Sequence, residues 1–240
     1  MIGKLALISG GTKGLGRVLS LGLAQNGYRV ISLYASDEGF AQTLRADVER
    51  MGLLSQVIRC DVGSQQQVLT LFKNSRSWFD ESEITLIHNA SSSFSPRPFL
   101  QIPWEEFQTL HQTNAGGYYN LTQACLPRML VRKKGTVIDI LSGALQASPP
   151  KGFASYLCAK GGLQSFSRSL ASEYSRLGIR IYSFSPGLMD TPLTQSWDPM
   201  MMDLMTRGGV RASPPEEVAE RILKIMSNPE TQGQGENYAV

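Results

Sequence analysis

Residues 5–27 read LALISGGTKGLGRVLSLGLAQNG, and this stretch sets the architecture of the whole chain. Its first part, Leu5–Ser9, is a nearly continuous apolar run, which is typical of a strand covered on both faces. The glycine-rich turn Ser9–Gly16 follows at once, and an amphipathic stretch then runs to Asn26 and stops at Gly27. Because backbone amides point out of the start of a helix, we expect a nucleotide at this turn, with a purely structural turn as the alternative. The turn residues expected to contact the nucleotide are Gly10, Thr12, Lys13, Gly14, Leu15 and Gly16.

Beyond this unit, apolar runs alternate with helical patterns along the chain. Further strands are expected at Val30–Tyr34, Gln56–Cys60, Ile84–Ile87, Thr136–Ile140, Ile179–Phe184 and Asn237–Val240. Helices are expected at Phe40–Met51, Gln65–Phe79, Trp104–Leu130, Phe153–Leu177 and Pro215–Met226. This alternation predicts an α/β fold with a doubly wound parallel sheet of about seven strands, helices on both faces and right-handed crossovers. With no internal repeat or linker, residues 1–240 are expected to form a single domain.

Composition narrows the class of protein. The 240 residues are 42% hydrophobic, enough for a full core, and 23 basic against 20 acidic residues give a net charge of only +3. We therefore expect no nucleic-acid or membrane partner, and no run of about 20 apolar residues predicts a membrane helix. Three widely spaced cysteines (Cys60, Cys125 and Cys158) show no metal-ligand spacing, so no metal is expected. A reduced, soluble, cytoplasmic protein without a signal peptide fits best.

Tyr156 and Lys160 stand four apart in an expected helix, so both side chains lie on one face. A neighbouring ammonium favours the ionised form of a phenol, whose ordinary pKa is ~10. Ser142, at the carboxyl end of the preceding strand, can bring a hydroxyl to the same place. This trio could protonate or deprotonate a carbonyl or alcohol oxygen. Taken alone, such a pair is more often a solvated surface pair.

The end of the second strand bears on which nucleotide binds. In the dinucleotide fingerprint an acidic residue about 20 positions after the turn holds the ribose 2′-hydroxyl of NAD. That place falls at Tyr34–Ala35, which is not acidic, while Lys13 and Ser36 could hold a 2′-phosphate. The sequence therefore favours NADP(H), although Asp37–Glu38 lies close enough to keep NAD(H) open.

Two further strand ends are expected at the cofactor. Asp61, followed by Val62, could accept from the adenine amino group or cap the helix that starts near Ser64. The small and amide side chains of Asn89–Ala90 suit a backbone pressed against a ligand. His88 is expected to be a packed or capping imidazole rather than a base.

Several motifs occur together in one order: Ser9-Gly10-x-x-x-Gly14-x-Gly16, Asn89-Ala90, Asn114, Ser142, Tyr156-x-x-x-Lys160 and Pro186-Gly187. This series resembles the short-chain dehydrogenase/reductase family over nearly the whole chain, in a pattern most similar to the beta-ketoacyl-[acyl-carrier-protein] reductases. The resemblance implies a Rossmann-type domain, a nicotinamide cofactor and a homo-oligomer (tetramer or dimer).

The resemblance also implies roles. Tyr156 would be the general acid for a carbonyl oxygen, Lys160 would lower its pKa and bind the nicotinamide ribose, and Ser142 would polarise the carbonyl. Asn114 would anchor a water that links Lys160 to solvent. Residues implied near the nicotinamide are Pro186, Gly187 and Thr191.

The chain departs from the family pattern in a few places. Ser142 and Tyr156 are 14 positions apart (156 − 142), one more than is common, and we place the extra residue in the loop Ala147–Gly152. His88 and Ser91 stand where the family usually has asparagine and glycine. The tail stops early, at Val240, which leaves open any interface built from a longer tail.

Substrate choice is expected to rest on Phe94–Leu100, Ala144–Gly152 and a flap at Leu193–Val210. The flap carries Trp197 and four methionines, which either adapt to an apolar ligand or pack on the core. A cluster of basic residues could steer an acidic acyl carrier protein, or could be ordinary solvated surface. Its members are Arg128, Arg132, Lys133, Lys134, Arg168 and Arg176.

Three functions are therefore weighed. The first is an NADPH-dependent ketoreductase of a beta-ketoacyl thioester, carrier- or CoA-linked, in fatty acid or polyketide biosynthesis. The second is an NAD(P)-dependent dehydrogenase of a free secondary alcohol, sugar or polycyclic ketone. The third, a non-catalytic cofactor-sensing protein, is disfavoured because Tyr156 and Lys160 are both present.

Overall fold

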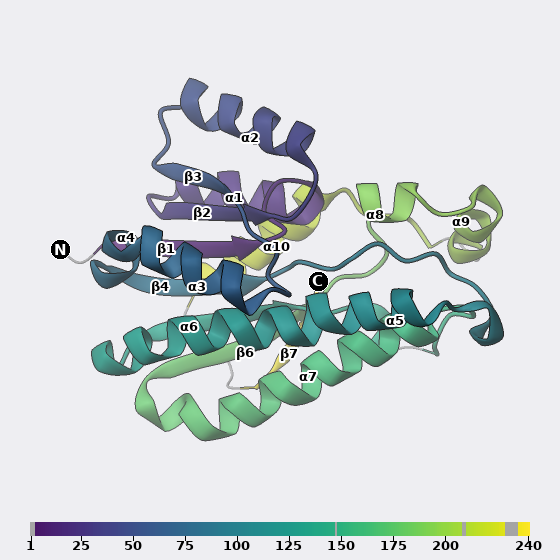
Figure 1. Ribbon diagram of the computed structural model, residues 1–240. Coiled ribbons are helices and arrows are strands. Elements are labelled where there is room, and N and C mark those ends of the chain that lie inside the picture. Colours follow the sequence, from purple (N-terminus) through teal and green to yellow (C-terminus); the bar gives the residue numbers. More distant parts are fainter. Residues whose placement is uncertain (1–2, 147, 208–209, 229–234) are drawn as a thin grey trace.

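A parallel sheet forms the centre of the protein, whose computed structural model describes residues 3–146, 148–207, 210–228 and 235–240. In this part of the chain the strands run in the order β3-β2-β1-β4-β5-β6-β7, and all neighbours are parallel (Figure 1). The strands are β1 (Gly3–Ser9), β2 (Arg29–Tyr34), β3 (Ser55–Arg59), β4 (Ser82–His88), β5 (Gly135–Ile140), β6 (Ile179–Ser185) and β7 (Asn237–Ala239). The predicted doubly wound, Rossmann-type α/β sheet is confirmed.

Helices cover both faces of the sheet. They are α1 (Gly14–Gln25), α2 (Glu38–Arg50), α3 (Gln65–Asn74), α4 (Arg76–Asp80), α5 (Trp104–His111), α6 (Gly117–Arg132), α7 (Ala154–Tyr174), α8 (Pro192–Gln195), α9 (Pro199–Thr206) and α10 (Pro215–Ser227). Within β1, Ala6 and Ile8 pack with α1 and α10, whereas Leu5 and Leu7 pack on the other face with α3, α6 and α7. Burial on both faces is the reason that this strand is almost entirely apolar. None of the described helices is long and apolar enough to cross a membrane.

Two predicted helices are interrupted. The helix expected at Gln65–Phe79 breaks at Ser75 into α3 and α4, because this bend stacks Phe79 on Phe72 with ring centroids 4.0 Å apart. The helix expected at Trp104–Leu130 contains a π-helical turn, Gln112–Gly116, between α5 and α6. The Asn114 amide donates to the Leu110 carbonyl there, four residues back, and π-turns of this kind are frequent at functional sites.

The strand order reverses between β1 and β4, and ligands of such sheets bind outside the carboxyl ends of the strands at this point. The flap helices α8 and α9 stand beyond that end of the sheet, beside the start of α5 (Figure 1). Most of the predicted flap and of the loop Ala144–Gly152 is described, but residues 147, 208 and 209 lie outside the described residues.

Candidate active site

The glycine turn is shaped by close backbone approach. Gly14 has φ +52°, in the left-handed region that favours glycine. A Cβ added to Gly16 would lie 2.1 Å from the Gly10 carbonyl oxygen, so only glycine lets α1 begin this close to β1. This exposes the start of α1, where unpaired amides favour an anion.

The end of β4 is tied to this turn by hydrogen bonds. The Asn89 amide donates to the carbonyls of Ser9 (3.1 Å) and Gly10 (3.0 Å). The Ser9 hydroxyl in turn accepts from the backbone amides of Asn89 and Ala90, at 3.0 Å each. Asn89 thus fixes the turn as well as standing at the expected cofactor position.

A cleft of about 540 Å³ opens from the glycine turn and ends at Tyr156 and Lys160. Of the expected site residues, those that line it are Gly10, Thr12, Lys13, Gly14, Leu15, Ser36, Asp61, Val62, Asn89, Ala90, Tyr156, Lys160 and Thr191. Those that do not line it are Gly16, Asn114, Ser142, Pro186 and Gly187. One continuous cavity therefore joins the expected nucleotide site to the expected acid-base pair.

Asp61 and Thr191 also have local structural roles. The Asp61 carboxylate accepts from the Gly63 amide at 2.9 Å, and Ser64, not Asp61, caps α3. Thr191 forms a capping box with Thr194 at the start of α8 and lies against Gly14. The capping alternative for Asp61 is therefore wrong, whereas its contact with the adenine amino group stays a prediction, because Asp61 lines the cleft.

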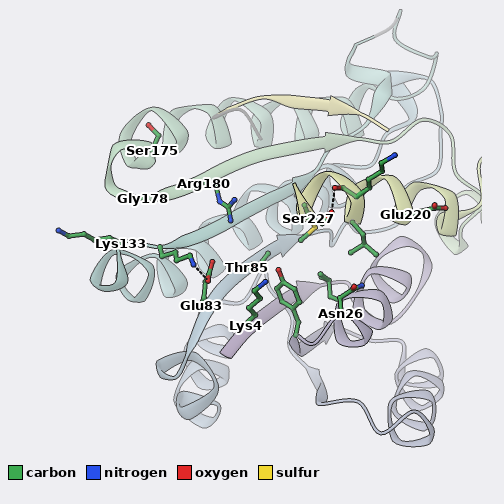
Figure 2. Close-up of a pocket in the computed structure, with 16 residues that line it drawn as sticks. Lys4, Asn26, Glu83, Thr85, Lys133, Ser175, Gly178, Arg180, Glu220 and Ser227 are labelled. Carbon is green, nitrogen blue, oxygen red and sulfur yellow. Dashed lines mark hydrogen bonds and ion pairs between the residues drawn. The ribbon is translucent and has the colours of Figure 1, made fainter. Parts of the chain in front are cut away.

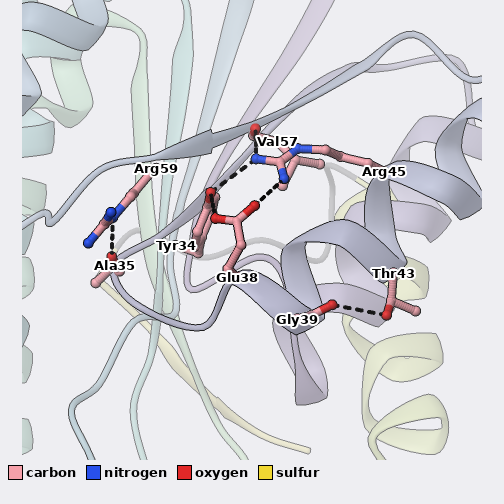
Figure 3. Close-up of polar contacts among 8 residues, drawn as sticks. All are labelled: Tyr34, Ala35, Glu38, Gly39, Thr43, Arg45, Val57 and Arg59. Atoms are coloured by element: carbon pink, nitrogen blue, oxygen red, sulfur yellow. Dashed lines mark hydrogen bonds and ion pairs between the residues drawn. The ribbon is translucent and has the colours of Figure 1, made fainter.

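The carboxylates after β2 are both paired, and Figure 3 shows the contacts of Glu38. Glu38 accepts from Arg45 at 2.6 Å and from the Tyr34 hydroxyl at 2.5 Å, and these bonds hold the pKa of the Glu38 carboxyl below its usual value. Asp37 pairs with Lys13, the lysine expected to hold a 2′-phosphate. Sequence reasoning missed the two arginines from α2 and β3: Arg59 is the Cα partner of Tyr34, and its guanidinium donates to the Ala35 carbonyl at 3.0 Å.

Tyr156 and Lys160 lie together under the carboxyl end of β5. The Lys160 ammonium is 5.9 Å from the centre of the Tyr156 ring and donates to the Ile140 carbonyl at 2.8 Å. Burial raises the pKa of Tyr156 to about 12, against the effect of the neighbouring Ser142 hydroxyl. Burial also lowers the pKa of Lys160 to about 8, although Asp139 raises it. The expected lowering of the phenol pKa is thus wrong, because loss of hydration outweighs the effect of the Ser142 hydroxyl.

Asn114 is fully buried in the π-helical turn. Its amide donates to the Leu110 carbonyl at 2.9 Å and to the Ser91 hydroxyl at 3.2 Å. Its Oδ1 atom has no hydrogen-bond partner among the described residues. A buried acceptor without a protein partner can accept a hydrogen bond from a bound water molecule. Anchoring a water is the role that the resemblance implies for Asn114.

Aromatic rings from the flap and a loop enclose the phenol. Phe94 stacks on Tyr156 with centroids 4.5 Å apart and planes 10° apart. Phe153 and Trp197 pack edge-on against Phe94, and the Trp197 indole donates to the Phe94 carbonyl at 3.1 Å. Flap methionines Met201, Met202 and Met205 pack on this cluster. The flap therefore covers the end of the cleft at Tyr156.

A second cavity, of about 1160 Å³, lies at the opposite, amino ends of the strands (Figure 2). Lys133 and Lys134 of the basic cluster line it, and Lys134 pairs with Glu83 at 2.8 Å. Arg128 pairs with Asp80 at 3.0 Å. Lys133 and Lys134 therefore lie at the end of the sheet opposite the cleft, and the pairing of Arg128 and Lys134 favours an ordinary solvated surface for this part of the cluster.

Comparison with known proteins points to one family. The sequence profile of the short chain dehydrogenases matches residues 4–202. The chain is 27% identical over 234 residues to the uncharacterised oxidoreductase YgfF of Escherichia coli, with 93% of each chain covered. It is 28% identical over 193 residues to the 3-oxoacyl-[acyl-carrier-protein] reductase FabG of Staphylococcus aureus, with 80% of this chain and 77% of FabG covered.

The fold has a close match among solved structures. The crystal structure of a 3-ketoacyl-(acyl-carrier-protein) reductase from Brucella melitensis, complexed with NADH, superposes with a TM-score of 0.86. The superposition covers 99% of this chain and 96% of that one, at 22% sequence identity. At this identity the likeness concerns the arrangement of strands and helices.

Proposed function

The chain belongs to the short-chain dehydrogenase family and is an oxidoreductase, and on that basis we propose that it reduces a ketone to a secondary alcohol with NADPH. The proposed ketone is that of a beta-ketoacyl thioester, as the names of its FabG relatives suggest. The observation that carries the proposal is the single cleft that runs from the glycine turn to Tyr156 and Lys160.

The residues of the cleft fit a nicotinamide dinucleotide. The turn of Gly14 and Gly16 leaves room for a pyrophosphate at the start of α1. Lys160 can donate to ribose hydroxyls while it keeps its bond to Ile140. A bound nicotinamide would supply the hydride.

NADPH is favoured because each carboxylate near the end of β2 already has a cationic partner. Lys13 and Asp37 are about half exposed, and a surface pair of this kind contributes at most ~1 kcal/mol. Lys13 could therefore exchange Asp37 for a cofactor 2′-phosphate as its partner at little cost in free energy. Arg59 adds a second cation beside Ser36.

Tyr156 is suited to give a proton to the ketone oxygen. With a pKa of about 12 it is a neutral phenol at physiological pH, which is the form that a reduction needs. Ser142, beside the phenol, can donate to the same oxygen. The aromatic cover from Phe94 and Trp197 keeps bulk water from this point.

The experiment is Tyr156→Phe, assayed with acetoacetyl thioesters and NADPH. Turnover should fall by about 1000-fold because no acid remains at the ketone oxygen. Binding of NADPH, followed by its fluorescence, should change less than about twofold, since the phenyl ring keeps its packing. Tyr119→Phe, at a half-exposed tyrosine of α6, is the matched control. Retained turnover in Tyr156→Phe would overturn the proposal.

A second candidate is a reductase of a free, apolar ketone. It is favoured by the stacking of Phe94 on Tyr156, which places an apolar wall at the reacting group. A panel of carrier-bound, CoA-bound and free aryl or cyclic ketones separates the two candidates by kcat/KM. If free ketones are preferred by tenfold or more, the thioester is not the substrate.

A further inference from the structure

A row of polar side chains crosses the sheet from β1 to β7, toward the carboxyl ends of the central strands. Ser9, His88, Asp139, Ser183 and Asn237 are successive Cα partners on β1, β4, β5, β6 and β7. Registered neighbours in a parallel sheet project to the same face, here the face covered by α6 and α7. Two positions earlier in β1, β4, β5 and β6 the residues are apolar and belong to the core on that face: Leu7, Leu86, Val137 and Ile181.

Asp139 is the acidic member of this row and is completely buried, with 0% of its surface exposed. Its Oδ2 atom accepts from the Ser183 hydroxyl at 3.4 Å, and its Oδ1 atom has no partner among the described residues. A carboxyl buried with so few hydrogen bonds destabilises the fold unless a cation compensates it. An apolar residue would fit this position better, so the carboxyl calls for an explanation.

A buried cation on this face of the sheet is Lys160, which belongs to α7. This lysine is 2% exposed and is fixed to β5 by its bond to Ile140, the residue after Asp139. Asp139 raises the pKa of Lys160, while the hydroxyls of Ser167 and Ser183 and, to a smaller extent, Lys160 lower the pKa of Asp139. Burial opposes both effects, and the two groups reach pKa values of about 7 and about 8.

Three other titratable groups face this pair. His88 lies on β4, and burial lowers its pKa to about 3, so it is neutral and adds no charge. Tyr118 of α6 is held protonated by burial and by Asp139. Tyr156, on the same helix as Lys160, is likewise a neutral phenol. Among the described groups packed here, Asp139 is therefore the counter-charge that Lys160 meets.

We propose that Asp139 is a positioning residue for the active site, whose buried carboxylate keeps Lys160 in the ammonium form. This inference rests on the proposed function, because only a reductase of this kind needs that ammonium beside the ribose and the phenol. Asp139 does not line the cleft, so it acts through Lys160 and not directly on the cofactor or the ketone.

The test is the titration of the Lys160 ε-carbon by NMR in the ligand-free protein, with the signal assigned from Lys160→Ala. The wild-type midpoint is expected near 8. In Asp139→Asn the midpoint should fall by about one unit, because the shape is kept while the charge is lost. NADPH affinity should fall at high pH as Lys160 loses its proton. In Asp139→Asn this fall should begin about one pH unit lower than in the wild type. An unchanged midpoint in Asp139→Asn overturns the inference.

Two further variants keep the test decisive. Val137→Ala makes a cavity in the same strand without a change of charge, so its midpoint should equal that of the wild type despite lower stability. If Asp139→Asn does not fold, Asp139→Thr removes the same charge in a smaller side chain. Failure of the proposed function is seen separately, as retained turnover in Tyr156→Phe. If Tyr156→Phe is inactive but the Lys160 midpoint is unchanged in Asp139→Asn, the inference on Asp139 fails while the proposed function stands.

Discussion

At the scale of single residues, we expect the choice of cofactor to depend on the charge of Lys13. Lys13→Ala should weaken NADPH binding by about tenfold and leave NADH binding nearly unchanged, because only NADPH carries a 2′-phosphate for this cation. Asp37→Asn should strengthen NADPH binding, since it frees Lys13 from its partner. Dissociation constants for both cofactors, from fluorescence titration, measure the effect. Arg50→Ala, at an exposed cation paired with Asp47, is the control. Equal binding of NADH and NADPH by the wild type would contradict the NADPH assignment.

At the scale of elements, the flap of α8 and α9 is held over the phenol by Trp197. Trp197→Ala removes a buried indole and its bond to Phe94, so the flap should open more often. Hydrogen exchange in residues 192–206 should speed up by at least about tenfold, while the strands stay protected. Trp197→Phe keeps a ring and loses only the hydrogen bond, so it should show a smaller change of about 1 kcal/mol. If hydrogen exchange speeds up equally in the strands and in the flap, Trp197 stabilises the whole fold and not the flap in particular.

At the scale of the whole molecule, stability should depend on pH through the buried row. His88 has a pKa of about 3, below its ordinary 6.5, so its contribution to stability is lost as pH falls from 6.5 to 3. Asp139 has a pKa of about 7, above its ordinary 3.8, so its contribution is lost as pH rises from 3.8 to 7. The contributions of His88 and Asp139 to the free energy of unfolding change with pH in opposite directions. Each changes by up to ~1.4 kcal/mol per pH unit. Urea unfolding from pH 4.5 to 6.5 should therefore show stability that falls with pH in His88→Asn and rises with pH in Asp139→Asn. Parallel curves for both variants and the wild type would exclude this coupling.

Much of the fold followed from local patterns. Strand and helix periodicities, the glycine turn and the spacing of Tyr156 and Lys160 are written in short segments, because backbone geometry repeats every two or 3.6 residues. Those segments correctly predicted the parallel sheet and brought Tyr156 and Lys160 into the cleft that begins at the glycine turn.

Other features depend on contacts between segments far apart in the chain. The pairing of Lys13 with Asp37, the stacking of Phe94 on Tyr156 and the row from Ser9 to Asn237 arise only when strands align and the flap folds over. The direction of the Tyr156 pKa belongs here as well, because the degree of burial of a phenol is a property of the packed protein. Short-range periodicity carries no information on which distant side chains meet, or on how much water each one loses.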